Sequence, residues 1–230
     1  MQNADEYSWT TFDETLSRLV RMVKPRTVLD VGAGAGKYAE LVRAIDPTIH
    51  ITATELGEDS IQRHGLAEKY DVILRETSSS IIERHPVANY DLVIMGDVIE
   101  HMRKSEGLDF LNWINYRSKY IAIVVPEAMP MSRDPWYEGH NSVWTDRDFS
   151  WHDNWCFSHI EQAQLFLLRG YLQHDLSMAE VCDQLNASDI MLEHFGGKKP
   201  MGLVHMHSVK SVIKPSPNPG MEITVWWRVQ

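Results

Sequence analysis

Cysteine, runs of basic residues and long apolar stretches are all scarce in this 230-residue sequence. The two cysteines, Cys156 and Cys182, show neither metal-binding nor redox spacing, which is typical of a reducing, cytoplasmic protein. No apolar run approaches the length of a membrane span, and an N-terminus carrying Asp5 and Glu6 has the wrong polarity for a signal peptide. We therefore expect a cytoplasmic location and no membrane partner.

Basic residues are also scarce relative to acidic ones. The sequence has 22 basic and 32 acidic residues, a formal net charge of -10, and no more than two adjacent basic residues, as at Lys198 and Lys199. An acidic surface repels phosphate backbones, so no nucleic acid partner is expected. Hydrophobic residues make up 43% of the chain and charged residues 23%, which is ordinary for a soluble globular protein. At this length we expect a single domain over residues 1–230.

The stretch Thr27–Val42 (TVLDVGAGAGKYAELV) is the feature around which the chain is organised. Its β-forming residues come first, glycines then recur at 32, 34 and 36, and helical spacing follows, which predicts a strand, a tight turn and a helix. Glycines allow close approach of a ligand, and the N–H groups of the following helix favour a negatively charged or hydroxyl-rich one. A Walker loop is disfavoured because Val31 occupies its first glycine position and Tyr38 stands where the motif requires Ser or Thr.

The order Asp30-x-Gly-x-Gly-x-Gly resembles the first motif of class I S-adenosylmethionine-dependent methyltransferases. The resemblance covers roughly residues 25–130 and implies S-adenosyl-L-methionine as cofactor. It also implies that Asp30 holds the methionine end of the cofactor, and that the turn residues Gly32, Ala33 and Gly34 contact it. The alternative is a glycine turn that only joins a strand to a helix.

A second predicted strand, His50–Glu55, ends at Glu55, nineteen positions after Gly36. In a βαβ unit this strand lies beside the first, so we expect Glu55 to accept the ribose hydroxyls, with Leu56 beside it. After a third strand, Tyr70–Leu74, the resemblance implies that Glu76 hydrogen-bonds the adenine amino group, and Thr77 beside it is expected to bind the cofactor. A surface pair of Arg75 with Glu76 is the alternative, and Thr77 is also expected to cap the next helix.

The fourth predicted strand, Tyr90–Met95, runs into Gly96-Asp97-Val98-Ile99-Glu100-His101, which is similar to the fourth motif of small class I methyltransferases. The resemblance implies that Asp97 lies near the sulfonium of the cofactor. His101 is a candidate general base, because its ordinary pKa suits proton transfer near neutrality. The alternative for His101 is a helix N-terminal residue bonded to the backbone.

Residues 127–160, after a fifth strand at Tyr120–Pro126, are rich in Trp and His. The run Tyr137–Thr145 resembles a loop at the substrate mouth of some small methyltransferases, so we expect His140 to be a second catalytic candidate. The aromatic residues are expected to line this mouth, the alternative being a satellite hydrophobic cluster. The histidine spacings form no recognised ligand set, so no metal is expected.

Helices are expected at Ile160–Tyr171 and Ser177–Leu185, and strands at Gly202–Ile213 and Met221–Val229. The predicted fold is therefore α/β: a Rossmann-like, doubly wound, mostly parallel seven-stranded sheet, with its last strand antiparallel and a helical insertion before the final hairpin. Within the single domain we expect an N-terminal helix or lid (1–24, including Tyr7 and Trp9), a cofactor-binding core (25–130), an aromatic loop and helical cap (131–200) and a C-terminal hairpin (201–230).

These features predict methyl transfer from S-adenosylmethionine to a small-molecule acceptor, with His101, His140 and Asp97 as catalytic candidates. The methylated atom, O, N or C, stays open, and a homodimer could form through the helical insertion. Alternatives are S-adenosylmethionine binding without catalysis and methylation of a protein side chain. A nicotinamide dehydrogenase is disfavoured by the glycine spacing, and a DNA-binding regulator using residues 177–195 is disfavoured by the acidity of that segment.

Overall fold

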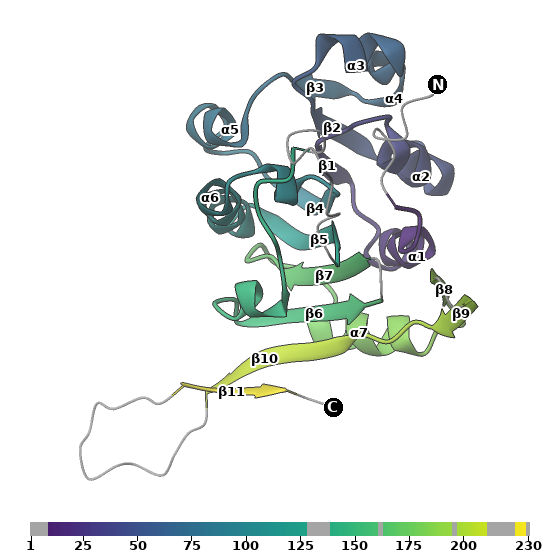
Figure 1. The fold of residues 1–230 in the computed structure, drawn as a ribbon, viewed down its shortest axis with the longest axis vertical. Helices are drawn as coiled ribbons and strands as arrows, with labels where there is room; N and C mark the ends of the chain where they lie inside the picture. Colours follow the sequence, from purple (N-terminus) through teal and green to yellow (C-terminus); the bar gives the residue numbers. More distant parts are fainter. Residues whose placement is uncertain (1–8, 128–138, 161–162, 195–196, 211–223, 229–230) are drawn as a thin grey trace, which may run out of the picture.

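One nine-stranded sheet, in the order β11-β10-β6-β7-β5-β4-β1-β2-β3, runs through the computed structural model (Figure 1). The structure describes residues 9–127, 139–160, 163–194, 197–210 and 224–228. The strands of this sheet are β1 Thr27–Val31, β2 His50–Thr54, β3 Val72–Leu74, β4 Tyr90–Gly96, β5 Ser118–Pro126, β6 Asn154–His159, β7 Ala163–Arg169, β10 Val204–Lys210 and β11 Thr224–Arg228. A separate hairpin pairs β8 Met191–His194 with β9 Gly197–Pro200.

The first five strands are parallel and confirm the strands predicted between residues 27 and 126. β1 pairs with β2 on one side and with β4 on the other, so the strand order reverses at β1. The carboxyl ends of all five strands lie at the same edge of the sheet. In open α/β sheets, ligands bind at this edge, beside the point of reversal.

Helices cover both faces of the sheet, as a doubly wound fold requires (Figure 1). The helices are α1 Asp13–Val23, α2 Lys37–Ile45, α3 Glu58–Arg63, α4 Leu66–Lys69, α5 Ser78–Arg84, α6 Lys104–Asn115 and α7 Met178–Asn186, with short 3-10 turns η2 Ile99–His101 and η3 Asp146–Phe149. Residues of α1, α2 and α7 share one buried cluster, and residues of α5 and α6 share the other.

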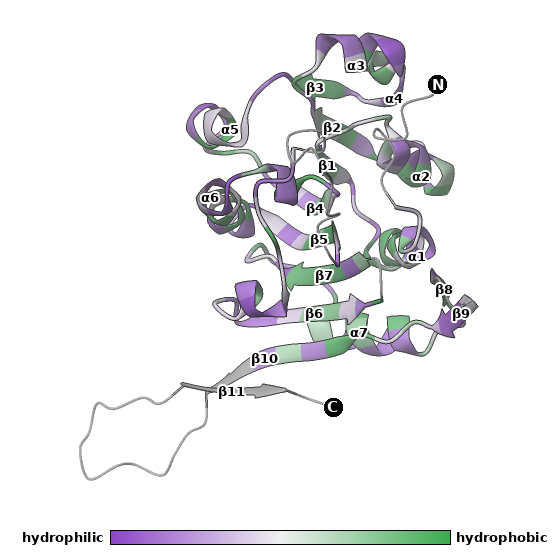
Figure 2. Ribbon diagram, in the orientation of Figure 1, coloured by the Kyte–Doolittle hydropathy of each residue, from purple (hydrophilic) through white to green (hydrophobic). Residues whose placement is uncertain are grey.

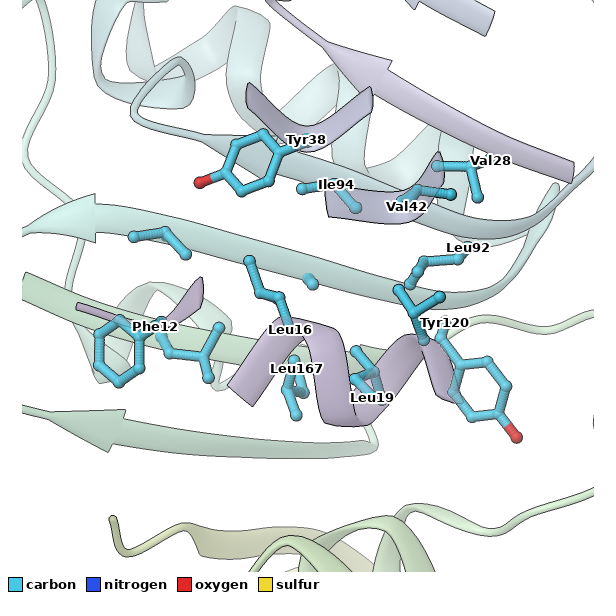
Figure 3. Packing of buried hydrophobic residues seen from close by; sticks show 14 of the residues in the cluster. Phe12, Leu16, Leu19, Val28, Tyr38, Val42, Leu92, Ile94, Tyr120 and Leu167 are labelled. Atoms are coloured by element: carbon cyan, nitrogen blue, oxygen red, sulfur yellow. The ribbon is translucent and has the colours of Figure 1, made fainter. Parts of the chain in front are cut away.

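The α1 helix forms because its apolar residues recur at three- and four-residue spacing and face the sheet. Figure 3 shows Phe12, Leu16 and Leu19 packed toward side chains of β1, α2, β4 and β5. In Figure 2 the central strands β5 and β7 are apolar, whereas the outer helix α3 is polar. The sheet centre is therefore buried on both faces, as the apolar sequence of β5 requires.

The seven strands β3-β2-β1-β4-β5-β7-β6 form the predicted doubly wound sheet, with β7 antiparallel to both of its neighbours. Their place in the sequence differs from the prediction. The predicted helix Ile160–Tyr171 is wrong, because this segment carries β7, whose run Leu165–Leu168 is buried in the sheet. A short, wholly apolar run has no period that separates a buried strand from a buried helix.

The predicted C-terminal hairpin is confirmed, but it extends the sheet to nine strands, since β10 pairs with β6 and β11 pairs with β10. The second predicted helix, Ser177–Leu185, is confirmed as α7, and Ser177 and Glu180 form its N-terminal capping box. Later in the segment 177–195, which the disfavoured DNA-binding alternative would use, the chain forms the strand β8. In the part of the chain that the structure describes, no helix is long and apolar enough to cross a membrane.

Candidate active site

A cleft of about 400 Å³ opens at the carboxyl edge of the parallel strands. Its floor comes from the ends of β1 and β2, at Gly32, Thr54 and Glu55. A polar wall follows β3, and an apolar wall is built from α5, α6 and the segment after β4, at Ile81, Val98, Met102 and Phe110. The cleft thus lies beside the reversal of strand order, where a ligand is expected.

The glycine turn between β1 and α2 has positive φ at Gly32, Gly34 and Gly36, at 75°, 51° and 83°. A Cβ added at Gly32 would lie 2.4 Å from Cγ2 of Val98, so both backbone angle and space require glycine there. The N–H groups of Gly32 and Ala33 donate to the Thr54 carbonyl at 3.0 and 2.9 Å. These two N–H groups therefore join the turn to β2.

Glu55 bridges the turn and the segment after β2. Its carboxylate accepts from the N–H of Gly34 at 3.2 Å and from the N–H of Gly57 at 2.9 Å, and the side chain lines the cleft. The structure therefore places Glu55 beside the glycine turn, as its offset predicts. Both of its carboxylate oxygens accept from backbone N–H groups.

Asp30 lies at the end of β1, directly before the glycine turn, and is 1% exposed. The Tyr70 hydroxyl donates to its Oδ2 at 2.5 Å, whereas Oδ1 is buried and has no hydrogen-bond partner among the described residues. Burial raises the pKa of the Asp30 carboxyl to about 7, and the Tyr70 hydrogen bond opposes this shift. Asp30 does not line the cleft itself.

Three further predicted residues line the cleft: Leu56, Glu76 and Thr77. Leu56 is 60% exposed, which leaves a large apolar side chain open to a flat ligand. Glu76 lies 3.3 Å from His85 and 3.6 Å from Arg84, both at the C-terminal end of α5, and the alternative pairing with Arg75 is absent because Arg75 contacts Glu58. Thr77 caps α5 as predicted, accepting from the Ser80 N–H at 3.2 Å.

Asp97 follows β4 with φ at 50°, in the left-handed region that non-glycine residues rarely occupy. Its Oδ2 accepts from the backbone N–H of Trp9 at 3.0 Å. Lys37, at the start of α2, donates to the Trp9 carbonyl and to Asp13, both at 2.7 Å. The Trp9 backbone is thus held between Asp97, which follows β4, and Lys37, at the start of α2. Tyr7, the other proposed lid residue, lies outside the described residues.

Glu100, His101 and His140 form a cluster at one end of the cleft, which His101 lines. The His101 and His140 rings meet edge to face, with centroids 4.7 Å apart. Glu100 is 2% exposed, and burial raises the pKa of its carboxyl to about 8, with a smaller contribution from the charge of Asp97. The two histidines predicted as catalytic therefore do meet, around a buried acid.

The expectation that aromatic residues line a substrate mouth is wrong for most of the described segment. Trp144, Phe149 and Trp155 are buried in the hydrophobic core, and the Trp144 indole donates to Ser142 at 2.8 Å. His152 is buried too, 3.2 Å from Asn115, and burial lowers its pKa to about 4. Trp136 and Tyr137 lie outside the described residues. His140 is the described member of this stretch that reaches the site.

Sequence reasoning missed several residues of the cleft and cluster. The cleft is also lined by Val31, Thr54, Ser78, Ser79, Ile81, Val98, Met102, Glu106 and Phe110. Glu100 lies in the motif Gly96–His101, but its burial depends on η2 and on the segment after β5. Local sequence patterns do not reveal this burial.

No family model matches the chain, and no curated protein matches it. Solved structures do. The methyltransferase domain of bacterial CtHen1-C is 16% identical, with a TM-score of 0.55 over 70% of this chain and 97% of that chain. A SAM-dependent methyltransferase from Archaeoglobus fulgidus is 16% identical, with a TM-score of 0.53 over 68% of this chain and 94% of that chain.

The N-terminal domain of EvdMO1 with SAH bound is 14% identical, with a TM-score of 0.50 over 71% of this chain and 82% of that chain. At such identities the likeness establishes the fold alone. The chain has the fold of class I S-adenosylmethionine-dependent methyltransferases, which confirms the fold that the glycine and Glu-His motifs predict.

Proposed function

We propose that the protein transfers the methyl group of S-adenosylmethionine to a small-molecule acceptor. Its methyltransferase fold is the first support for this proposal. The observation that carries the proposal is the cleft itself. It lies at the reversal of strand order, and Gly32 of the glycine turn and Glu55 line it. Fold alone does not assign a function, so the residues of the cleft must fit the cofactor.

Two features support that fit, one in the cleft and one directly before the glycine turn. The first is Gly32, where the contact with Val98 leaves no space for a side chain, so the backbone itself forms the floor. The second is the buried Oδ1 of Asp30, which lacks a hydrogen-bond partner in the described chain. A buried carboxylate oxygen without a partner is costly, and a ligand ammonium group would remove that cost.

In this proposal, Glu55 binds the ribose hydroxyls, exchanging its backbone donors for them. Leu56 and Thr77 contact the adenine, and Glu76 accepts from its amino group. Asp30, Gly32, Ala33 and Gly34 hold the methionine end, with Asp97 close to the sulfur. The bound cofactor supplies a methyl group that is already activated for transfer to a nucleophile.

The task left to the chain is to hold the acceptor in line, because orientation of this kind can supply roughly 7–11 kcal/mol of barrier reduction. An acceptor hydroxyl, amine or carbon acid must also lose a proton. His101 lies at the cleft and His140 beside it, and these are the proposed proton acceptors, with Asp97 as the orienting carboxylate.

Glu55→Ala tests the proposal. It should weaken binding of S-adenosylhomocysteine by about 1–3 kcal/mol, the cost of leaving hydrogen-bonding groups of the ligand unpaired. Calorimetric titration measures the affinity, and a thermal melt checks that the turn pinned by Glu55 stays folded. Glu68→Ala, an exposed acid on α4, is the matched control and should bind normally. Unchanged affinity in folded Glu55→Ala would remove Glu55 from the site.

Catalysis, as opposed to binding alone, is measured separately by the conversion of S-adenosylmethionine to S-adenosylhomocysteine with candidate acceptors. Tight binding with no turnover on small molecules or protein side chains would favour a binding protein.

A further inference from the structure

The cluster at the end of the cleft joins side chains from two segments far apart in the sequence. Glu100 and His101 belong to η2, whereas His140 comes from the segment after β5. Each offers one nitrogen or oxygen atom, and these three atoms all lie within 4.8 Å of one another. A first-row metal ion with bonds of about 2.0–2.2 Å holds its ligand atoms up to roughly 4.4 Å apart, so small side-chain rotations would suffice.

The backbone around this cluster is fixed by hydrogen bonds. The N–H groups of Asn141 and Ser142 donate to the Glu100 carbonyl at 2.7 and 3.0 Å. The Asn141 side chain donates to the His101 carbonyl at 2.9 Å. Gly139 has φ at 64°, and a Cβ added there would lie 3.5 Å from Nδ1 of His101. The segment that carries His140 is therefore held against η2 at the cluster itself.

The burial of Glu100 is an independent indication of a cation-binding site. Its side chain is almost fully buried, and its Oε2 has no hydrogen-bond partner among the residues that the structure describes. A buried carboxylate is normally paired with a cation or with hydrogen-bond donors. Asp97, whose charge acts on Glu100, adds further negative charge nearby. A positive ion would balance the buried Glu100 carboxylate.

We propose that Glu100, His101 and His140 bind one divalent transition-metal ion at the end of the cleft. Two imidazoles and one carboxylate suit Zn²⁺, Mn²⁺, Fe²⁺ or Co²⁺ better than Mg²⁺ or Ca²⁺, which prefer oxygen ligands. Three protein ligands leave positions open on such an ion, as in catalytic sites. This proposal departs from the expectation, drawn from the histidine spacings, that no metal binds.

The open positions give the ion a role, and this step rests on the proposed function. Because His101 also lines the cleft, an acceptor there can coordinate the ion through a hydroxyl oxygen. Coordination lowers the pKa of the hydroxyl, so its proton leaves to solvent. The oxygen then forms a bond to the methyl carbon as the carbon–sulfur bond breaks and its electron pair remains on sulfur. The acceptor class would be alcohols or phenols, and the two histidines would act as ligands in place of free bases.

Zn²⁺ alone is the probe. The full chain, stripped with a chelator and dialysed, is titrated with ZnCl₂ in a calorimeter. We expect one site per chain, weakened at least about tenfold in Glu100→Gln and in His140→Ala, because each loses one of three ligands. His50→Ala is the matched control, since His50 is an exposed histidine 3.6 Å from Asp71 outside the cluster, and should bind Zn²⁺ like the parent.

Thermal melts check the fold, and Glu100→Gln keeps the size of the side chain if His140→Ala proves unstable. The proposal is overturned if the parent binds no Zn²⁺, or if the folded Glu100→Gln variant binds it equally well. S-adenosylhomocysteine is titrated into the same samples. Zinc binding without S-adenosylhomocysteine binding would leave the metal site standing and remove the methyltransferase proposal, and the reverse result would do the opposite.

Discussion

The turn after β1 and the segment after β5 leave the same edge of the sheet, yet they build the site in different ways. The turn after β1 is a continuous motif. Gly32 lines the cleft, and the N–H of Gly34 donates to Glu55, which also lines it. The segment after β5 sends Trp144 and Phe149 into the core and only His140, among its described residues, to the site. A continuous motif can thus predict which residues gather at a cleft, whereas an aromatic-rich segment does not by itself predict which residues reach a site.

The largest expected effect is at Gly32, in the first region. Gly32→Ala adds a Cβ 2.4 Å from Val98 at a φ of 75°, so strain and overpacking together should cost roughly 2–6 kcal/mol of unfolding free energy. S-adenosylhomocysteine binding should be lost as the floor of the cleft shifts. Urea unfolding and calorimetry measure the two effects.

Gly65→Ala is the matched control, because Gly65 has a φ of 58° but no atom within 4 Å of an added Cβ. It should cost only about 1–2 kcal/mol of backbone strain and leave binding intact. Equal binding by both variants would contradict the role given to the turn.

Trp144 gives the next largest effect, in the second region. Trp144→Ala should lower the unfolding free energy by roughly 3–5 kcal/mol, because a buried side chain is removed from the core. Trp151→Ala, at a residue 37% exposed, should cost less than about 1 kcal/mol. Urea unfolding compares them. A stable Trp144→Ala protein with a raised KM for the acceptor would restore the tryptophan to a substrate mouth.

Asp30→Asn, at the end of β1, is expected to change how the unfolding free energy depends on pH. In the parent, the folded pKa of about 7 lies above the ordinary 3.8, so the folded state binds the proton more tightly than the unfolded state. This group therefore lowers parent stability as pH rises from about 4 to 7, by roughly 4 kcal/mol at most. Asp30→Asn lacks this loss and should be the more stable protein at pH 8, with the difference vanishing near pH 4.

Urea unfolding at several pH values measures the Asp30 effect. S-adenosylhomocysteine affinity of the parent should also rise between about pH 6 and 8, because the charged carboxylate is the form that holds an ammonium group. A parent and an Asp30→Asn variant with parallel stability profiles would show that Asp30 does not titrate as described.

Much of the parallel half could be predicted from the sequence, because each strand there is apolar and ends at a polar or glycine signal. β1, β2, β4 and β5 lie at their predicted positions for this reason. β7 could not be predicted, since Leu165–Leu168 carries no period, and its pairing with β5 is set by the tertiary fold. The same holds for Glu100, whose burial and contact with His140 depend on a segment forty positions away.

In the turn after β1, residue spacing predicted that Glu55 lies beside the glycines. It did not reveal that the N–H groups of Gly32 and Ala33 donate to the carbonyl of Thr54 in β2. Spacing also did not reveal that Asp30 is buried against Tyr70. Motifs specify which residues gather at a site, whereas hydrogen-bond partners depend on neighbouring strands and helices.

The most direct test of the central claim is a crystal structure of the protein with S-adenosylhomocysteine. We expect the ligand in the cleft of about 400 Å³, with its ribose hydroxyls on Glu55 and its adenine beside Leu56. Ligand density elsewhere on the protein, or a cleft that stays empty at saturating S-adenosylhomocysteine, would contradict the account.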